Sequence, residues 1–340
     1  MRQAVMVEPG TIEFREIDKP AIADDEVLIE VKRIGVCGSD IHVYHGMHPY
    51  TSYPIVQGHE VSGVVAETGS GVDDLSIGDT VTFMPQVVDD VCYQCRHGSY
   101  HICDSLKVMG FQTGGAAAEY FPIAADKVLK VADSVSLDEA AMVEPVSVAV
   151  HALRRGGEIK GKKVLVLGSG TIGNLVGQVA NAFGASAVIN TDISDYKLEK
   201  ARTCGLEFGV NTAKEDLADA LLRVFGPDGA DLTLECVGAQ QTIDQAIEHA
   251  RKGTTIVVVG VFGEKPRVDL GLVQDRELNL AGTLMYQQAD YETAIELVES
   301  GELQLAEMIT HRFDFSDYLA AYHAIENSDG RYMKVMIELT

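Results

Sequence analysis

The sequence predicts a two-domain α/β protein, in which an irregular β-rich domain precedes a doubly wound domain with a parallel sheet. Three observations lead to this prediction. The chain has 340 residues, of which 46% are hydrophobic, so it can bury a core large enough for two domains. Its N-terminal half contains short β-type runs separated by glycines, and its later half alternates strand and helix patterns.

The first expected domain covers residues 1–150. Val27–Val31 and Val61–Glu67 are short runs of the β type, and glycine-containing turns lie between such runs. Short strands with glycine turns are typical of an irregular β domain rather than of a helical one.

After Lys163 the pattern changes to alternating strands and helices. Strands are predicted at Val164–Leu167, Ala187–Thr191, Leu232–Glu235, Thr255–Val259 and Leu278–Gly282, and helices at Asn174–Phe183, Lys197–Thr203 and Gln241–His249. Such alternation predicts βαβ units and a parallel sheet over residues 151–283. The remaining segment, 284–340, is predicted to contain helices at Tyr291–Glu299 and Tyr318–Asn327 and a closing strand at Lys334–Leu339.

Charge and cysteine content restrict the partners and the compartment. The 27 Lys and Arg against 51 Asp and Glu give a net charge of -24, which repels phosphates, so neither nucleic acid nor an anionic membrane is expected to bind. A small molecule is the expected partner. No signal peptide and no run of 18 apolar residues is found, and six cysteines are too few for a disulfide scaffold, so we expect a cytoplasmic protein.

A glycine motif indicates a dinucleotide site. Gly168-Ser169-Gly170-Thr171-Ile172-Gly173 follows the predicted strand Val164–Leu167 and opens the next helix. In this context the glycines allow a tight turn and close approach to a pyrophosphate at the helix N-terminus. Asp192, 19 residues after Gly173, can accept hydrogen bonds from a ribose and would repel a 2′-phosphate, which favours NAD over NADP. Lys197 is the nearby cation that could weaken this preference.

Two groups of residues have the chemistry of metal ligands. Cys37, His59 and one carboxylate, from Glu60 or Glu144, would form a zinc site with an open fourth position. A thiolate, a neutral imidazole and a carboxylate neutralise Zn²⁺. The second group is Cys92-x2-Cys95-x7-Cys103, in which three cysteines lie within twelve positions.

On these motifs the chain resembles the medium-chain, zinc-dependent alcohol dehydrogenases, in the branch that contains sorbitol (polyol), threonine and 2,3-butanediol dehydrogenases. The resemblance runs nearly end to end. It implies a GroES-like catalytic domain over residues 1–150, completed by 284–340, and a Rossmann NAD-binding domain over 151–283. It also implies a homotetramer or homodimer.

The resemblance implies roles for individual residues. Cys37, His59 and Glu144 would bind the catalytic zinc, while Glu60 would support this site or exchange with Glu144, and Asp40 would orient His59. Ser39 and His42 match the family's proton relay, in which the serine hydroxyl takes the alcohol proton and the imidazole passes it to solvent by way of the cofactor ribose.

The cysteine group matches the last three positions of the family's four-cysteine structural zinc lobe, and Asp89 occupies the first position. A carboxylate can bind zinc, so Asp89, Cys92, Cys95 and Cys103 could hold a structural ion, less tightly than four thiolates would.

The expected function is zinc-dependent transfer of hydride between a secondary alcohol, on a polyol or vicinal diol, and NAD, giving a ketone. Tyr44 falls close to the position of the substrate-facing tyrosine of sorbitol dehydrogenases, although a packed loop tyrosine is nearly as good an interpretation. Met285 stands about where those enzymes have an arginine. An enzyme similar to L-threonine 3-dehydrogenase or to a sugar-alcohol-phosphate dehydrogenase is an alternative. The zinc-free quinone reductase branch is disfavoured by Cys37 and His59. A non-catalytic dinucleotide-binding protein is the alternative from another class.

Overall fold

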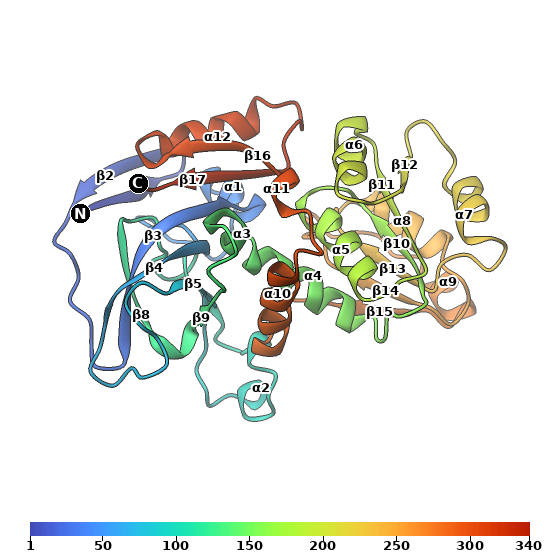
Figure 1. Ribbon diagram of the computed structural model, residues 1–340. Helices are drawn as coiled ribbons and strands as arrows, with labels where there is room; N and C mark the ends of the chain where they lie inside the picture. The colour runs from blue at the N-terminus through green and yellow to red at the C-terminus, as the bar shows by residue number, and fades with distance from the viewer. The chain divides into compact units, whose positions relative to one another are not determined.

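The computed structural model describes all 340 residues, which divide into two compact units (Figure 1). The first unit comprises Met1–Glu144, Gln287–Glu299 and Ile309–Thr340, and the second comprises Pro145–Tyr286 and Ser300–Met308. The first unit thus ends at the beginning of helix α4 (Val143–Arg155), six residues before the expected boundary at 150.

The C-terminal segment is shared between the units, whereas the sequence assigned all of 284–340 to the first domain. Ser300–Met308 belongs to the second unit because its backbone is hydrogen-bonded there. The Gln304 N–H donates to Gln178 Oε1 at 2.7 Å, and Lys200 Nζ donates to the Glu307 carbonyl at 3.2 Å.

The first unit is built on a seven-stranded sheet. Its strands follow the order β16 (Ile309–Asp314), β17 (Lys334–Glu338), β3 (Glu26–Val36), β4 (Glu60–Thr68), β5 (Thr80–Phe83) and β9 (Val128–Lys130), and β8 (Tyr120–Ala124) pairs with β3. Strand β17 lies antiparallel to β3, so the end of the chain completes the first unit. Val27, Ile29 and Val31 alternate along β3 and are all buried in its core, as period-two side chains of a strand must be.

Smaller elements complete this unit. Two-stranded sheets pair β1 (Arg2–Glu8) with β2 (Thr11–Glu16) and β6 (Gln86–Val87) with β7 (Lys107–Val108). The helices are α1 (Gly38–Tyr44), α2 (Tyr93–Arg96), α3 (Leu137–Ala141), α10 (Gln288–Ser300) and α12 (Tyr318–Glu326), with short 3₁₀ turns at Tyr100–Ile102, Ala125–Lys127 and Phe315–Asp317.

The second unit has a six-stranded sheet in which every pair of neighbouring strands is parallel. The order is β12 (Phe208–Asn211), β11 (Ala187–Asp192), β10 (Lys163–Leu167), β13 (Leu232–Glu235), β14 (Thr255–Val258) and β15 (Asn279–Gly282). Its remaining helices are α5 (Thr171–Ala182), α6 (Asp195–Thr203), α7 (Leu217–Phe225), α8 (Gln240–Glu248), α9 (Leu270–Asp275) and α11 (Leu305–Met308). The strand order reverses between β10 and β13, which is where doubly wound sheets bind ligands.

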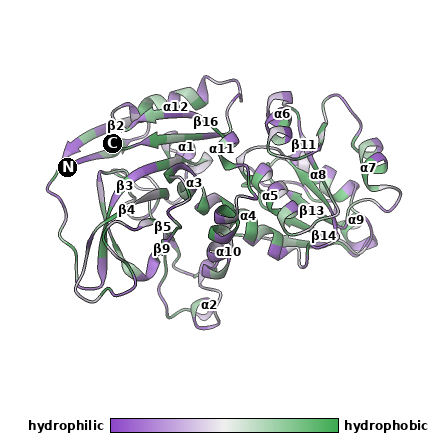
Figure 2. Ribbon diagram, in the orientation of Figure 1, coloured by the Kyte–Doolittle hydropathy of each residue, from purple (hydrophilic) through white to green (hydrophobic).

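The predicted α/β class with a parallel sheet is confirmed, and several short elements were missed. The sequence analysis did not predict strands β12 and β16 or helices α7 and α9. Helix α7 carries green and purple residues together in Figure 2, and it buries Leu217, Leu221 and Phe225 while Leu222 is exposed. None of the helices is long and apolar enough to cross a bilayer.

Candidate functional site

A thiol, an imidazole and a carboxylate meet in the first unit. Cys37, His59 and Glu60 each offer one ligand atom, and these atoms lie within 4.8 Å of one another. Cys37 directly follows β3 and precedes α1, while His59 directly precedes β4, which begins with Glu60. In the antiparallel ladder between β3 and β4, Gly35 is paired with Glu60. This register brings the end of β3 and the start of β4 together.

The site leaves space that only a glycine can provide. A Cβ atom at Gly35 would lie 2.2 Å from Glu60 Oε2, so a side chain at position 35 would displace this carboxylate. His59 and Glu60 are 4% and 2% exposed, and His59 Nδ1 is buried without a hydrogen-bond partner. Thiolate, imidazole and carboxylate are the ligands that Zn²⁺ prefers, and a three-ligand set leaves a position for substrate, so these residues fit a catalytic zinc ion.

Asp40 lies beside the ligands. Its Oδ2 atom accepts the Cys37 N–H at 2.9 Å, and its Oδ1 atom lies 3.7 Å from His59 Nδ1. Because the carboxylate faces Nδ1, the other ring nitrogen, Nε2, is the one left for a metal. The expected orienting role of Asp40 remains a proposal, and this geometry supports it.

Electrostatics at this site favour protonation of the imidazole while no metal is bound. Burial lowers the pKa of His59, but the Asp40 carboxylate, the Cys37 thiol and the Glu144 carboxylate outweigh burial and raise it to about 10. Burial also raises the pKa of Asp40, although His59 acts in the opposite direction. A metal that takes the imidazole must therefore displace a proton.

The two candidate glutamates both lie near the thiol and the imidazole, in different elements. Sequence reasoning made Glu144 the ligand and Glu60 a supporting or exchanging residue. Glu60 offers a ligand atom within 4.8 Å of those of Cys37 and His59, and Glu144 is near enough to raise the pKa of His59, so the choice between the two glutamates stays a prediction. The ladder register brings Glu60 to its position. Glu144 lies in the first turn of α4 and is 6% exposed. Glu60 Oε2 also forms a buried ion pair with Lys334 Nζ at 2.5 Å.

The expected relay residues both lie on α1, with Ser39 half-buried and His42 exposed. Sequence reasoning missed His48, whose ring stacks on Phe111 with centroids 5.0 Å apart, while Phe111 contacts the His59 ring at 4.7 Å. No motif marks His48, since this contact depends on the fold.

The candidate substrate tyrosine is engaged in packing. The Tyr44 hydroxyl lies 3.2 Å from His323 Nε2, and the Tyr44 ring contacts Tyr322 with centroids 5.4 Å apart. Both partners belong to α12. These contacts favour the packed-residue alternative for Tyr44.

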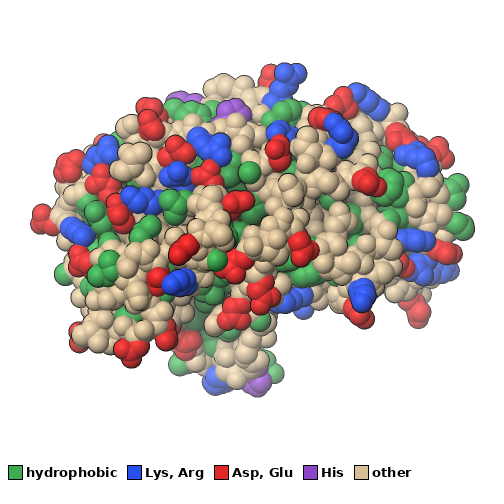
Figure 3. All heavy atoms as spheres, viewed as in Figure 1, with side chains coloured by type: hydrophobic (Ala, Val, Ile, Leu, Met, Phe, Trp, Pro, Cys, Tyr) green, Lys and Arg blue, Asp and Glu red, His purple; other side chains and the backbone are tan.

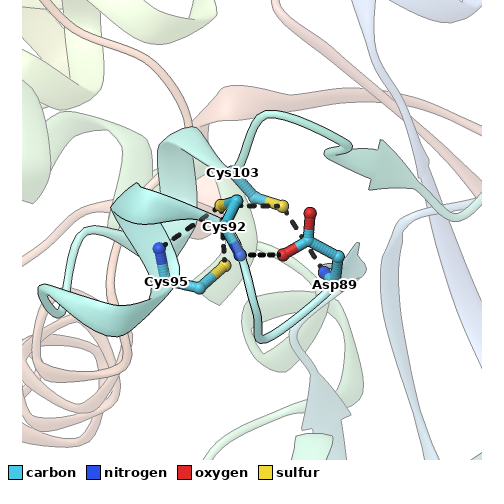
Figure 4. Close-up of side chains that lie close together, drawn as sticks. All are labelled: Asp89, Cys92, Cys95 and Cys103. Carbon is cyan, nitrogen blue, oxygen red and sulfur yellow. Dashed lines mark hydrogen bonds between the residues drawn. The ribbon is translucent and has the colours of Figure 1, made fainter.

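A second cluster lies in the loop around α2, where the side chains of Asp89, Cys92, Cys95 and Cys103 point toward one another (Figure 4). One ligand atom from each lies within 4.8 Å of the others. The Cys92 sulfur is 3.4 Å from that of Cys95 and 3.8 Å from that of Cys103. Sulfurs bound to one tetrahedral zinc at about 2.3 Å lie about 3.8 Å apart, so this loop fits a zinc ion.

Backbone amides support the negative charge of this loop. The Asp89 carboxylate accepts the N–H groups of Cys92 and Val91 at 2.9 Å, and these bonds hold the pKa of Asp89 well below its usual range. The Cys95 N–H donates to the Cys92 sulfur, which lowers the pKa of that thiol, whereas burial raises the pKa of Cys95 to about 12. Zinc binding would therefore release a proton from Cys95.

The second unit contains a cavity of about 360 Å³ at the carboxyl ends of its strands. Gly168, Gly170, Asp192 and Lys197 line it, as expected for a cofactor pocket. Thr171, Ile172 and Gly173 instead form the first turn of α5 and are not among the lining residues. Sequence reasoning missed the lining residues Ile193, Thr212, Cys236, Val237, Gln241, Thr242 and Gln245.

The glycines of the motif have different structural roles. A Cβ atom at Gly173 would lie 1.9 Å from the Gly168 carbonyl oxygen, so this glycine lets α5 approach the turn after β10. A Cβ atom at Gly170 would meet nothing within 4 Å, which leaves open space at the N-terminus of α5 for a ligand. Gly168 has φ of +99°, a conformation that glycine adopts readily.

Two carboxylates shape the wall of this cavity. Asp192 Oδ2 accepts the Ser169 N–H at 3.0 Å, and its Oδ1 accepts the Ser194 N–H at 2.9 Å. Glu235, at the end of β13, is fully buried, and its Oε1 accepts the N–H groups of Val237 and Gly238 at 2.9 and 2.8 Å. Glu235 thus holds the loop at Val237, which lines the cavity and lies against Gly168, a role for which no sequence motif was recognised.

Family models of dehydrogenase domains match both parts of this chain. Residues 23–133 match the alcohol dehydrogenase GroES-like domain, and residues 171–300 match the zinc-binding dehydrogenase domain. D-xylulose reductase of Saccharomyces cerevisiae is 36% identical over 99% of this chain and 98% of its own length. L-threonine 3-dehydrogenase of Pyrococcus horikoshii is 33% identical over 91% of this chain and 90% of its own.

Among solved structures, galactitol-1-phosphate dehydrogenase from Escherichia coli is 30% identical and superposes with a TM-score of 0.92 over 100% of both chains. Because the two domain matches and the full-length relatives point the same way, this chain belongs to the medium-chain zinc-dependent alcohol dehydrogenase superfamily, in its polyol branch, and is a zinc-dependent oxidoreductase that uses a nicotinamide cofactor.

Proposed function

We propose that this enzyme oxidises a secondary hydroxyl of an uncharged polyol or vicinal diol to a ketone, with NAD as hydride acceptor, and catalyses the reverse reaction when NADH is in excess. The observation that carries this proposal is the group formed by Cys37, His59 and Glu60, in a chain that also has a dinucleotide-type cavity. Relatives named D-xylulose reductase and sorbitol dehydrogenase support the substrate class.

Cys37, His59 and Glu60 would hold the catalytic zinc, with Glu144 available to replace Glu60. When bound, zinc supplies a Lewis acid that makes an alcohol hydroxyl more acidic. Asp40 keeps His59 oriented, and Lys334 neutralises the Glu60 carboxylate while the latter is not used by the metal.

Ser39 and His42 would move the alcohol proton. The Ser39 hydroxyl can both accept and donate, and His42 is exposed on the same helix, so it can deliver the proton to water. His48 is a further imidazole near His42, and burial followed by the effect of His42 lowers its pKa.

NAD would bind in the cavity of the second unit, with its pyrophosphate at Gly168, Gly170 and the first turn of α5. The Asp192 carboxylate would accept hydrogen bonds from the adenosine ribose and exclude a 2′-phosphate. Lys197 also lines the cavity and would reduce, without reversing, the preference for NAD.

The absence of an evident anchor for a charged group supports an uncharged substrate. The segment Gly282–Tyr286 has Met285 where sorbitol dehydrogenases carry arginine. Acidic side chains are spread over the face in Figure 3, which matches the net charge of -24 and disfavours sugar phosphates. The relatives that are named as acting on threonine or a sugar-alcohol phosphate make those substrates necessary members of a test panel.

Assembly and compartment are part of this proposal. We expect a homodimer or homotetramer, and a mass of 36.6 kDa in size-exclusion chromatography with light scattering would contradict it. All six cysteines are free, which supports a reducing compartment such as the cytoplasm.

The decisive experiment measures initial rates of NAD⁺ reduction by the zinc-loaded enzyme. The panel contains polyols, vicinal diols, threonine, a sugar-alcohol phosphate and simple secondary alcohols. Good rates with polyols or diols alone would support the proposal, and preference for threonine or the phosphate would replace it with that alternative. Cys37→Ala should lose catalytic zinc and turnover while NADH still binds, and unchanged turnover would contradict the metal assignment.

A further inference from the structure

Asp40 connects the candidate metal centre to side chains that the proposed chemistry does not use. Its Oδ2 atom is held by the Cys37 N–H, and its Oδ1 atom faces His59 Nδ1 at 3.7 Å. The same Oδ1 atom also accepts a hydrogen bond from Gln57 Nε2 at 3.0 Å. Gln57 therefore contacts the carboxylate oxygen that the Cys37 N–H does not hold.

The Gln57 amide is buried and has one possible orientation. Gln57 is 2% exposed, and its Nε2 atom also lies 3.4 Å from the Asp40 carbonyl oxygen. Its Oε1 atom accepts the hydroxyl of Tyr322 at 2.9 Å. An ionised carboxylate and a carbonyl only accept hydrogen bonds, so the NH₂ group must face Asp40 and the amide oxygen must face Tyr322.

Tyr322 belongs to α12, far from Gln57 in sequence, and is fully buried. Its ring stacks on Tyr318 with centroids 5.7 Å apart, which holds the hydroxyl in place. Burial raises the pKa of Tyr322 well above its ordinary value, so the phenol remains a hydrogen-bond donor. Tyr322, Gln57 and Asp40 thus form a continuous buried chain of hydrogen bonds that ends beside His59.

We propose that Gln57 and Tyr322 are positioning residues that hold the Asp40 carboxylate toward His59 and thereby set the affinity of the catalytic centre for zinc. The inference rests on the proposed function, because it takes Cys37 and His59 as metal ligands.

Gln57 and Tyr322 would act by preventing rotation of the Asp40 carboxylate. With donors on both oxygens, the carboxylate cannot rotate without breaking a buried hydrogen bond. From 3.7 Å, the His59 Nδ1–H group must move by less than about 1 Å to reach hydrogen-bonding distance. A fixed carboxylate at this position orients the ring and makes it a stronger metal ligand, and losing such partners weakens metal binding about 10- to 100-fold.

The test compares zinc affinity in the wild type, in Gln57→Met, in Tyr322→Phe and in the double variant. Gln57→Met keeps the volume of the side chain but removes its hydrogen bonds to Asp40 and from Tyr322, and Tyr322→Phe removes one oxygen. The Zn²⁺ dissociation constant is measured by competition with a chromophoric chelator, and the coordination of Co²⁺ is followed by its visible absorption. We expect Gln57→Met to weaken binding about 10- to 100-fold and Tyr322→Phe about 3- to 10-fold.

Tyr322 acts on Asp40 only through its hydrogen bond to Gln57. The double variant should therefore bind zinc no more weakly than Gln57→Met alone. Thr254→Val is the control. This hydroxyl is also buried, but it donates to the Arg251 carbonyl in the second unit, so its loss should lower stability without weakening zinc binding at Cys37 and His59. If Gln57→Met does not fold, Tyr322→Phe decides the question, since removal of one oxygen leaves the packing intact.

Cys37→Ser separates the two possible failures. If this variant loses one zinc per chain while Gln57→Met and Tyr322→Phe retain wild-type affinity, the positioning role is refuted and the metal centre stands. If Cys37→Ser keeps the full zinc content, the metal assignment itself is wrong and the inference falls with it.

Discussion

The glycine motif has two roles that can be tested separately. Gly173 is needed for the packing of α5, and Gly170 leaves space for the pyrophosphate. At Gly173, an added Cβ atom would lie 1.9 Å from the Gly168 carbonyl oxygen and 2.8 Å from its carbonyl carbon. Ordinary contact begins at 3.4 Å, so Gly173→Ala requires α5 and the preceding turn to separate by about 1.5 Å. No rotamer can relieve a clash between a Cβ atom and backbone.

The expected cost follows from the burial of α5. Leu175, Val176 and Val179 on this helix are completely buried, so a shift of this size disrupts a packed core. Overpacking of this kind costs about 1–3 kcal/mol when side chains can adjust, and we expect at least about 3 kcal/mol here because they cannot.

Gly170→Ala is the matched control, because its Cβ atom meets nothing within 4 Å. As the N-cap residue of α5, with φ of -66°, position 170 accepts alanine at a cost of at most about 1 kcal/mol. The added methyl group projects into open space where the pyrophosphate would bind. This variant should keep its stability and bind NADH at least about 10-fold more weakly.

Unfolding is followed by circular dichroism in urea, and NADH binding by the fluorescence of the cofactor itself, since the chain has no tryptophan. Wild-type stability in Gly173→Ala would refute the packing argument. Wild-type NADH affinity in Gly170→Ala would refute the placement of the pyrophosphate.

Asp192→Ala should weaken NAD about 10- to 100-fold and NADP much less, because only NAD offers a free 2′-hydroxyl to the carboxylate; an unaltered ratio of the two dissociation constants would contradict this role. Asp89→Cys should bind lobe zinc more tightly than the wild type, and Asp89→Ala more weakly, as measured by chelator competition; equal affinity in all three would exclude Asp89 as a ligand. Asp138→Asn should lower stability at pH 7 by about 1–2 kcal/mol, because Asp138 accepts hydrogen bonds from Arg33 and Arg312. Burial raises the pKa of Asp138, but the two arginines outweigh it and lower the pKa below the unfolded value, so the contribution is present above about pH 4 and is lost as pH falls through the folded pKa. A difference between wild type and Asp138→Asn that stays constant in urea unfolding from pH 7 to pH 3 would contradict this assignment.

Local sequence determined the elements with strong periodicity or special residues. The short apolar runs Val164–Leu167 and Leu232–Glu235, which alternate with helix patterns, favoured central strands, and the glycines from 168 to 173 indicated a tight turn with a close helix. The spacing of Cys92, Cys95 and Cys103 likewise placed three thiols in one short loop, where a ligand group could be recognised without tertiary information.

Tertiary structure decided which groups meet across long sequence separations. The ladder between β3 and β4 brings Glu60 to Cys37, and β17 brings Lys334 to Glu60. The contact between Tyr322 and Gln57 arises in the same way. Such contacts leave no local pattern, because strand register and helix packing depend on the burial of the whole core, whereas the type of an element and the spacing within a motif are properties of a few neighbouring residues.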